Sequence, residues 1–112
     1  MWIFTRYGFL SVVQHNDEPD ILIVRSRFKG HIESIFGDLA KVMRTVGTDY
    51  EYRAEIQKEK VAEVMAKLIN NINYGNFKDE LDNRVKASQL DKTYFQRCWD
   101  TYKVVNYSLR WE

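Results

Sequence analysis

Two hydrophobic patterns of different period meet in residues 49–72, which read DYEYRAEIQKEKVAEVMAKLINNI. Apolar and charged residues alternate over 49–56, which is typical of a strand with one buried face. The face that we expect to be buried holds Tyr50, Tyr52, Ala54 and Ile56. From 58 to about 72, apolar residues recur at helical spacing, and they are Val61, Val64, Met65, Leu68, Ile69 and Ile72. The stretch predicts a strand followed directly by a helix, with Val64, Leu68 and Ile72 buried against the sheet.

A β-hairpin is predicted before this stretch. The apolar runs 9–14 and 21–28 flank the polar cluster 15–20, HNDEPD, which is typical of a turn longer than two residues. We expect residues 2–4 to extend the first strand, with Tyr7 and Gly8 as a bulge or bend. Alternation in the second strand assigns to the core Leu22, Val24, Ser26 and Phe28. It assigns to the opposite face Ile21, Ile23, Arg25 and Arg27.

Helices are predicted in the rest of the chain. Residues 31–44 carry an apolar stripe at helical spacing, and Gly47 is a stop signal beyond it. The last third contains a stripe at Phe77, Leu81 and Val85, and then a longer helix for which Ser88 is the expected cap. The stripe of this longer helix holds Tyr94, Phe95, Cys98, Trp99, Tyr102 and Val105.

The order of elements predicts an α+β fold. We expect a two-layer sandwich in which a small, mostly antiparallel sheet has helices on one face. Its ββαβ core resembles a ferredoxin-like variant with a helical C-terminal third in place of the last strand. The strand–helix–strand unit is expected to be right-handed. Residues 1–112 are predicted to form a single domain.

Composition excludes several function classes. The chain has 17 basic and 16 acidic residues and a net charge of +1, which disfavours non-specific DNA binding. No apolar run approaches the roughly 20 residues that span a bilayer, so no membrane partner is predicted. Cys98 is the only cysteine, which precludes an intramolecular disulfide and favours a reducing, cytoplasmic setting. We expect Cys98 to pack as a small hydrophobe rather than act as a nucleophile.

The first candidate site is an anion site before the helix at 31–44. Residues 25–30, RSRFKG, combine Arg25, Arg27 and a lysine with a glycine at a helix start. The two arginines share the open sheet face with Arg53 and with two carboxylates, those of Glu51 and Glu55. Cross-strand ion pairs could neutralise the arginines, or at least one arginine could stay free for a phosphate-bearing ligand.

The second candidate site is the connection 73–79, NYGNFKD, with Tyr74, Asn76 and Lys78 as its contact residues. The alternative is a plain helix–helix connection that Asn76 caps and Phe77 anchors. The open sheet face is expected to be charged rather than aromatic, which argues against base stacking there. His15 and His31 lack metal-ligand spacing and are expected to be solvent-exposed, so we predict no metal and no cofactor.

Several motifs resemble those of a family of small uncharacterised bacterial proteins. They are MWIFT at 1–5, GFLSVV at 8–13, VRSR at 24–27, DYEYR at 49–53 and NYGNFKD at 73–79. The resemblance implies a bacterial or phage source and carries no catalytic residue.

Together these features predict a small cytoplasmic binding module without catalysis, whose partner is a phosphate-bearing ligand or a protein. One alternative is an enzyme acting on a nucleotide or an RNA phosphodiester, with Arg25, Arg27 and Arg53 on the phosphate and His15 or a tyrosine moving the proton. Another is a homodimer whose interface buries the sheet or the aromatic tail, including Trp111.

Overall fold

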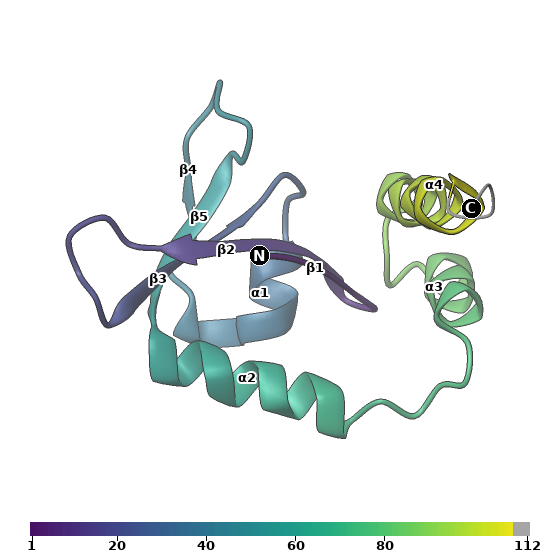
Figure 1. Cartoon of the computed structure of the whole chain (residues 1–112), viewed down its shortest axis with the longest axis horizontal. Helices are drawn as coiled ribbons and strands as arrows, with labels where there is room; N and C mark the ends of the chain where they lie inside the picture. Colours follow the sequence, from purple (N-terminus) through teal and green to yellow (C-terminus); the bar gives the residue numbers. More distant parts are fainter. Residues whose placement is uncertain (109–112) are drawn as a thin grey trace. The chain divides into compact units, whose positions relative to one another are not determined.

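The computed structural model describes residues 1–108, and the tail with Trp111 lies outside the described residues. The chain divides into two compact units, one of residues 1–73 and one that begins at Tyr74 (Figure 1). The first unit contains the sheet with two helices, and the second contains two further helices. The prediction of a single domain over the whole chain stays a prediction.

A five-stranded antiparallel sheet forms the first unit, in the order β1-β2-β3-β5-β4. The strands are β1 (Trp2–Thr5), β2 (Gly8–Gln14), β3 (Ile21–Ser26), β4 (Met43–Arg44) and β5 (Tyr52–Gln57). The hairpin of β2 and β3 is confirmed, with the predicted loop at 15–20. The α+β class and the antiparallel sheet are therefore confirmed, whereas the ferredoxin-like order is not.

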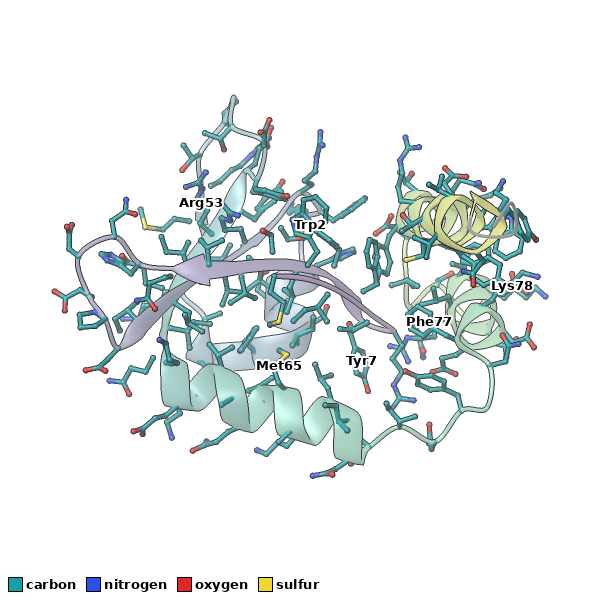
Figure 2. All side chains as sticks on the ribbon, in the orientation of Figure 1. Trp2, Tyr7, Arg53, Met65, Phe77 and Lys78 are labelled. Atoms are coloured by element: carbon teal, nitrogen blue, oxygen red, sulfur yellow. The ribbon has the colours of Figure 1, made fainter. Side chains whose placement is uncertain are left out.

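One face of the sheet is covered by α1 (His31–Phe36) and α2 (Lys58–Asn70) (Figure 1). The core between them contains Leu10, Val12, Val24, Ile32, Phe36, Ala54, Ile56 and Val61. The predicted alternation is confirmed for Val24, Ala54 and Ile56, which are all buried on this face. It is wrong for Tyr50, which lies before the start of β5 and whose ring contacts Phe9 and Arg25. Figure 2 shows Met65 of α2 on the same side, between the helix and the sheet.

Three predictions about the first unit are wrong. Residues 2–4 form the separate strand β1, because Thr5 Oγ1 accepts the Tyr7 and Gly8 N–H groups at 3.1 Å each and closes a tight turn to β2. The helix expected at 31–44 ends at Phe36, since Gly37 has a φ of +57°, and a short 3₁₀ turn, η1 (Gly37–Leu39), follows it. The expected right-handed crossover is absent, because β3 and β5 are antiparallel neighbours.

Burial along α2 also differs from the prediction at one end. Val61 is buried and Leu68 half-buried, but Ile72 is 52% exposed because the helix ends at Asn70. The expected stripe therefore contacts the sheet only over its N-terminal turns.

The second unit contains α3 (Phe77–Lys86) and α4 (Lys92–Ser108), as predicted for the C-terminal third. Asp91 caps α4, since its Oδ1 accepts the Tyr94 N–H at 2.7 Å. The expected cap, Ser88, has a φ of +58° in the preceding turn. Among the described residues of this unit, the buried apolar side chains are Leu81, Leu90 and Tyr94.

Candidate functional site

A row of cross-strand neighbours crosses the face of the sheet opposite α1 and α2. The register pairs Trp2 with Ser11, Ser11 with Arg25, Arg25 with Arg53, and Arg53 with Met43. Directly paired residues project from the same face, and neighbouring strands are about 4.8 Å apart. Figure 2 shows Trp2 and Arg53 on the side of the sheet opposite Met65. We call the side chains of Trp2, Ser11, Arg25 and Arg53 the open-face row.

Arg25 is held in place by uncharged partners. Its Nη2 donates to Ser11 Oγ at 2.7 Å, and its guanidinium carbon lies 4.5 Å from the centre of the Tyr50 ring. The Nε atom is buried and has no hydrogen-bond partner. Arg25 is therefore oriented by a hydroxyl and an aromatic ring, neither of which cancels its charge.

Arg53 lies directly opposite Arg25 and is anchored through the same tyrosine. Its Nε donates to the Tyr50 carbonyl oxygen at 3.1 Å. One residue thus contacts both arginines, by its ring and by its backbone. Two guanidinium groups on adjacent strands repel each other and together produce a local positive field.

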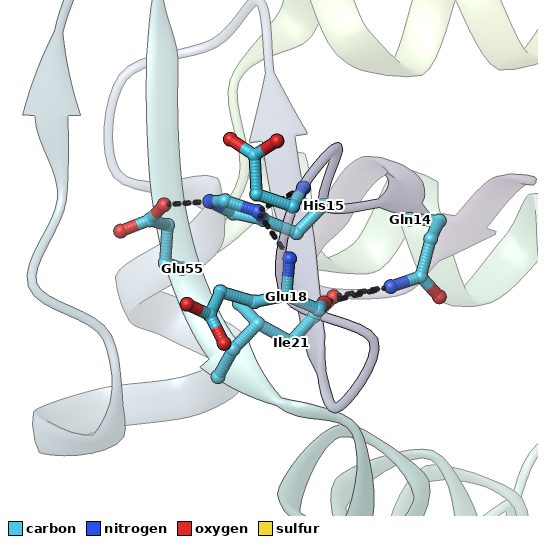
Figure 3. A network of polar contacts seen from close by, with 6 residues as sticks. Gln14, His15, Glu18, Ile21 and Glu55 are labelled. Carbon is cyan, nitrogen blue, oxygen red and sulfur yellow. Dashed lines mark hydrogen bonds and ion pairs between the residues drawn. The ribbon is translucent and has the colours of Figure 1, made fainter.

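The two carboxylates expected to neutralise these arginines are paired elsewhere. Glu51 Oε2 accepts from Arg44 Nε at 3.1 Å, and Glu55 Oε1 lies 2.6 Å from His15 Nε2 (Figure 3). The register places Glu55 opposite Ile23, two residues along β3 from Arg25. Within residues 1–108, no carboxylate lies at ion-pair distance from Arg25 or Arg53. The interpretation that a cross-strand ion pair neutralises Arg25 is therefore wrong.

His15 is fixed by the hairpin loop. Its Nδ1 accepts the N–H groups of Asp17 and Glu18 at 3.1 Å each, while Nε2 faces Glu55 (Figure 3). Both ring nitrogens are thus engaged in holding the loop against β5. The side chain of Gln14 donates to the Glu18 carbonyl of this loop at 2.9 Å and to the Ile21 carbonyl at 3.1 Å (Figure 3).

Arg27 lies outside the open-face row. The strand β3 ends at Ser26, whose buried hydroxyl donates to the Phe9 carbonyl at 2.7 Å. Arg27 follows in a bend and is exposed. The helix start that we expected to assist it belongs to α1, which has only six residues.

The open face is also more aromatic than predicted. The Phe9 ring stacks on Tyr50 with centres 6.3 Å apart, and Phe4 lies 5.1 Å from Phe9. Trp2 is 71% exposed at one end of the row. The expectation of a charged rather than aromatic face is therefore wrong. Only the register of β1 on β2 connects Trp2 with the arginines, and no local sequence pattern indicates that pairing.

The other predicted site residues lie in the second unit, where each has a local contact. Asn76 Oδ1 caps α3 by accepting the Asp79 N–H at 3.0 Å. The rings of Tyr74 and Phe77 are 5.9 Å apart, and Lys78 Nζ lies 4.8 Å from the Trp99 ring centre.

Three further observations concern side chains that could carry chemistry. No cluster of metal-ligating side chains occurs among residues 1–108. His31, which we expected to be exposed, is 5% exposed and accepts the Phe9 N–H at Nδ1. Burial raises the pKa of the Cys98 thiol to about 11, which leaves it mostly protonated. No described helix is long and apolar enough to cross a membrane.

Two shallow clefts lie in the first unit, away from the open-face row. One, of about 480 Å³, lies beside Asp20 and the start of α2, and the other, of about 320 Å³, lies beside Arg6 and Lys67. Neither is lined by Trp2, Arg25 or Arg53.

Comparison of the chain with protein-family models, with curated proteins and with solved structures finds no match.

Proposed function

We propose that the chain is a binding module without catalysis, and that its open-face row binds a phosphate-bearing ligand at Arg25 and Arg53. The observation that carries the proposal is the direct pairing of these two arginines without a carboxylate partner. A guanidinium fork matches two oxygens of a phosphate, and charge-assisted bonds of this kind are stronger than neutral ones. An anion at the row would also relieve the repulsion between the two cations.

The surroundings of the arginines support binding rather than a structural role. Ser11 and Tyr50 orient the side chains while leaving their charge uncompensated. Preorganised donors lose less side-chain freedom when a ligand arrives. Arg27 would add charge beyond the end of β3. Asn76 and Lys78 have contacts in the second unit that account for them, so the proposal does not depend on them.

The rival enzymatic function has less support. A proton-transfer group needs a ring nitrogen or hydroxyl within reach of the substrate, and both nitrogens of His15 are engaged in the loop.

A cytoplasmic setting remains our proposal from the single cysteine, since no intramolecular disulfide can form.

Calorimetric titration with inorganic tripolyphosphate tests the proposal. The double variant Arg25→Ala with Arg53→Ala removes the open-face pair. Its matched control is Lys60→Ala with Arg97→Ala, which removes two exposed cations that already pair with Glu63 and Asp100. The parent and the control should bind alike, and the test variant at least roughly tenfold more weakly. Equal binding by both double variants, or no binding by the parent, would refute the proposed function.

A further inference from the structure

We infer that the phosphate-bearing ligand is single-stranded nucleic acid, lying across the strands with its phosphates at Arg25 and Arg53 and one base stacked on Trp2. This inference rests on the proposed function and names its ligand. The observation that carries it is that the register aligns an exposed indole with the uncompensated arginine pair in a single row.

The length of the row suits a chain rather than a single phosphate group. Trp2 is two strands from Arg25 and three from Arg53, or about 10 and 14 Å at the usual strand spacing. Successive nucleotides of a stacked strand advance by about 3.4 Å, and by more when the strand is extended. A segment of a few nucleotides can therefore contact the indole and both guanidinium groups together.

The position of the row across four neighbouring strands also suits an extended ligand. Small molecules usually bind in concave pockets that bury most of their surface. The two clefts described above lie away from the row, which occupies the sheet face opposite α1 and α2. A flexible strand can lie on such a face and obtain its binding energy from separate contacts along it.

The exposed indole of Trp2 favours an anionic ligand with unpaired bases over other anionic ligands. An indole that is 71% exposed presents a flat π surface, and stacking on such a ring does not depend on base identity. In a duplex the bases are already stacked and paired, so the indole could not reach their faces. An acidic peptide could pair with the arginines, but its carboxylates would gain nothing from the indole.

Fluorescence anisotropy with end-labelled probes tests this inference. The probes are an eight-nucleotide oligouridylate, a polyphosphate of equal charge and an octaglutamate peptide. The variants are Trp2→Ala, Trp2→Phe and the double variant Arg25→Ala with Arg53→Ala. The control is Met43→Ala, next to Arg53 and beyond the row, where the side chain is 73% exposed. Thermal melts establish that each variant is folded.

We expect oligouridylate to bind most tightly, and Trp2→Ala to weaken it roughly tenfold while polyphosphate binding stays unchanged. Trp2→Phe should retain most of the affinity, and Met43→Ala all of it. Equal binding of oligouridylate and polyphosphate, both dependent on Arg25 and Arg53 but not on Trp2, would overturn the inference and leave the proposed function standing. Preference for octaglutamate would overturn the inference in favour of a protein partner. Binding that ignores both arginines would overturn the proposed function as well.

Discussion

Gly8 and His31 are in direct contact where β1 turns into β2. A Cβ added to Gly8 would lie 2.6 Å from His31 Nδ1, and Gly8 has a φ of +153°. The same nitrogen accepts the Phe9 N–H at 3.0 Å, so the ring cannot move away without losing that bond. The contact links the first hairpin to α1.

Gly8→Ala should therefore destabilise the protein by about 1–3 kcal/mol, because the added methyl overlaps a ring that is packed and hydrogen-bonded. Urea denaturation measures the loss. Gly75→Ala is the matched control, since nothing lies within 4 Å of its added Cβ, and it should stay within about 0.5 kcal/mol of the parent. Equal losses of stability from the two substitutions would show that the close contact between Gly8 and His31 does not matter for stability.

The Cys98 thiol should be slow to react in the native protein. Burial raises its pKa to about 11 from the ordinary 9.0, with Asp91 acting in the same direction and a Tyr94 hydrogen bond opposing it. At pH 8 this leaves roughly 100-fold less thiolate than in the unfolded chain. Labelling with a disulfide reagent, with and without urea, measures the ratio. The native rate should rise with pH up to about 11, and a native rate close to the unfolded one would contradict the expected burial.

The faces of Arg25 and Arg53 were predictable from the sequence, but their pairing was not. Alternation correctly assigned Arg25 and Arg53 to the face opposite Val24 and Ala54. The pairing between strands was not readable, because a two-residue shift of β5 keeps every side chain on its face while exchanging Arg53 for a glutamate. Whether Arg25 faces a glutamate or an arginine therefore depends only on the register of β5, which the whole sheet determines.

Among the elements, α2 shows where hydrophobic periodicity is informative and where it is not. Its apolar stripe continues to Ile72, but only Val61 is buried, while Ile69 and Ile72 are 68% and 52% exposed. Hydrophobic periodicity identifies which side of a helix faces the core, whereas the extent of the sheet determines how many turns of that side are buried.

Val61→Ala should accordingly cost about 1–3 kcal/mol, because it leaves a cavity against Ala54 and Ile56. Ile69→Ala, on the same helix, should cost less than about 0.5 kcal/mol. Chemical denaturation of both variants gives the comparison. A larger loss from Ile69→Ala would mean that the covered part of the helix is assigned wrongly.

The start of α3 depends on Asn76. Asn76→Ala removes the acceptor of the Asp79 N–H and should cost about 1 kcal/mol, and Asn76→Ser should restore most of it. Asn83→Ala, an exposed position within the same helix, is the control and should be neutral. Circular dichroism during thermal unfolding follows the loss. If Asn76→Ala left stability unchanged but abolished ligand binding, Asn76 would be a binding residue rather than a cap.

At the scale of the whole molecule, the open-face row lies entirely within the first unit. The sequence allowed prediction of the α+β class, the main hairpin and the helical C-terminal third. It did not allow prediction of β1 as a separate strand, because the tight turn depends on the Thr5 hydroxyl and on the approach of His31 to Gly8. That strand brings Trp2 into the row, so the aromatic part of the site could not be foreseen.

Charge reversal at Arg53 tests most directly whether the arginine pair is an open anion site. Arg53→Glu places a carboxylate opposite Arg25, and the parent, this variant and Lys60→Glu are melted with tripolyphosphate or with sodium chloride of equal ionic strength. A ligand at 100 times its Kd stabilises the folded state by about 2.7 kcal/mol, which raises Tm by several degrees. We predict this rise for the parent and for Lys60→Glu, and none for Arg53→Glu, whose Tm without ligand should match or exceed that of the parent. An equal rise in Arg53→Glu, or no rise in the parent, would contradict the existence of the site.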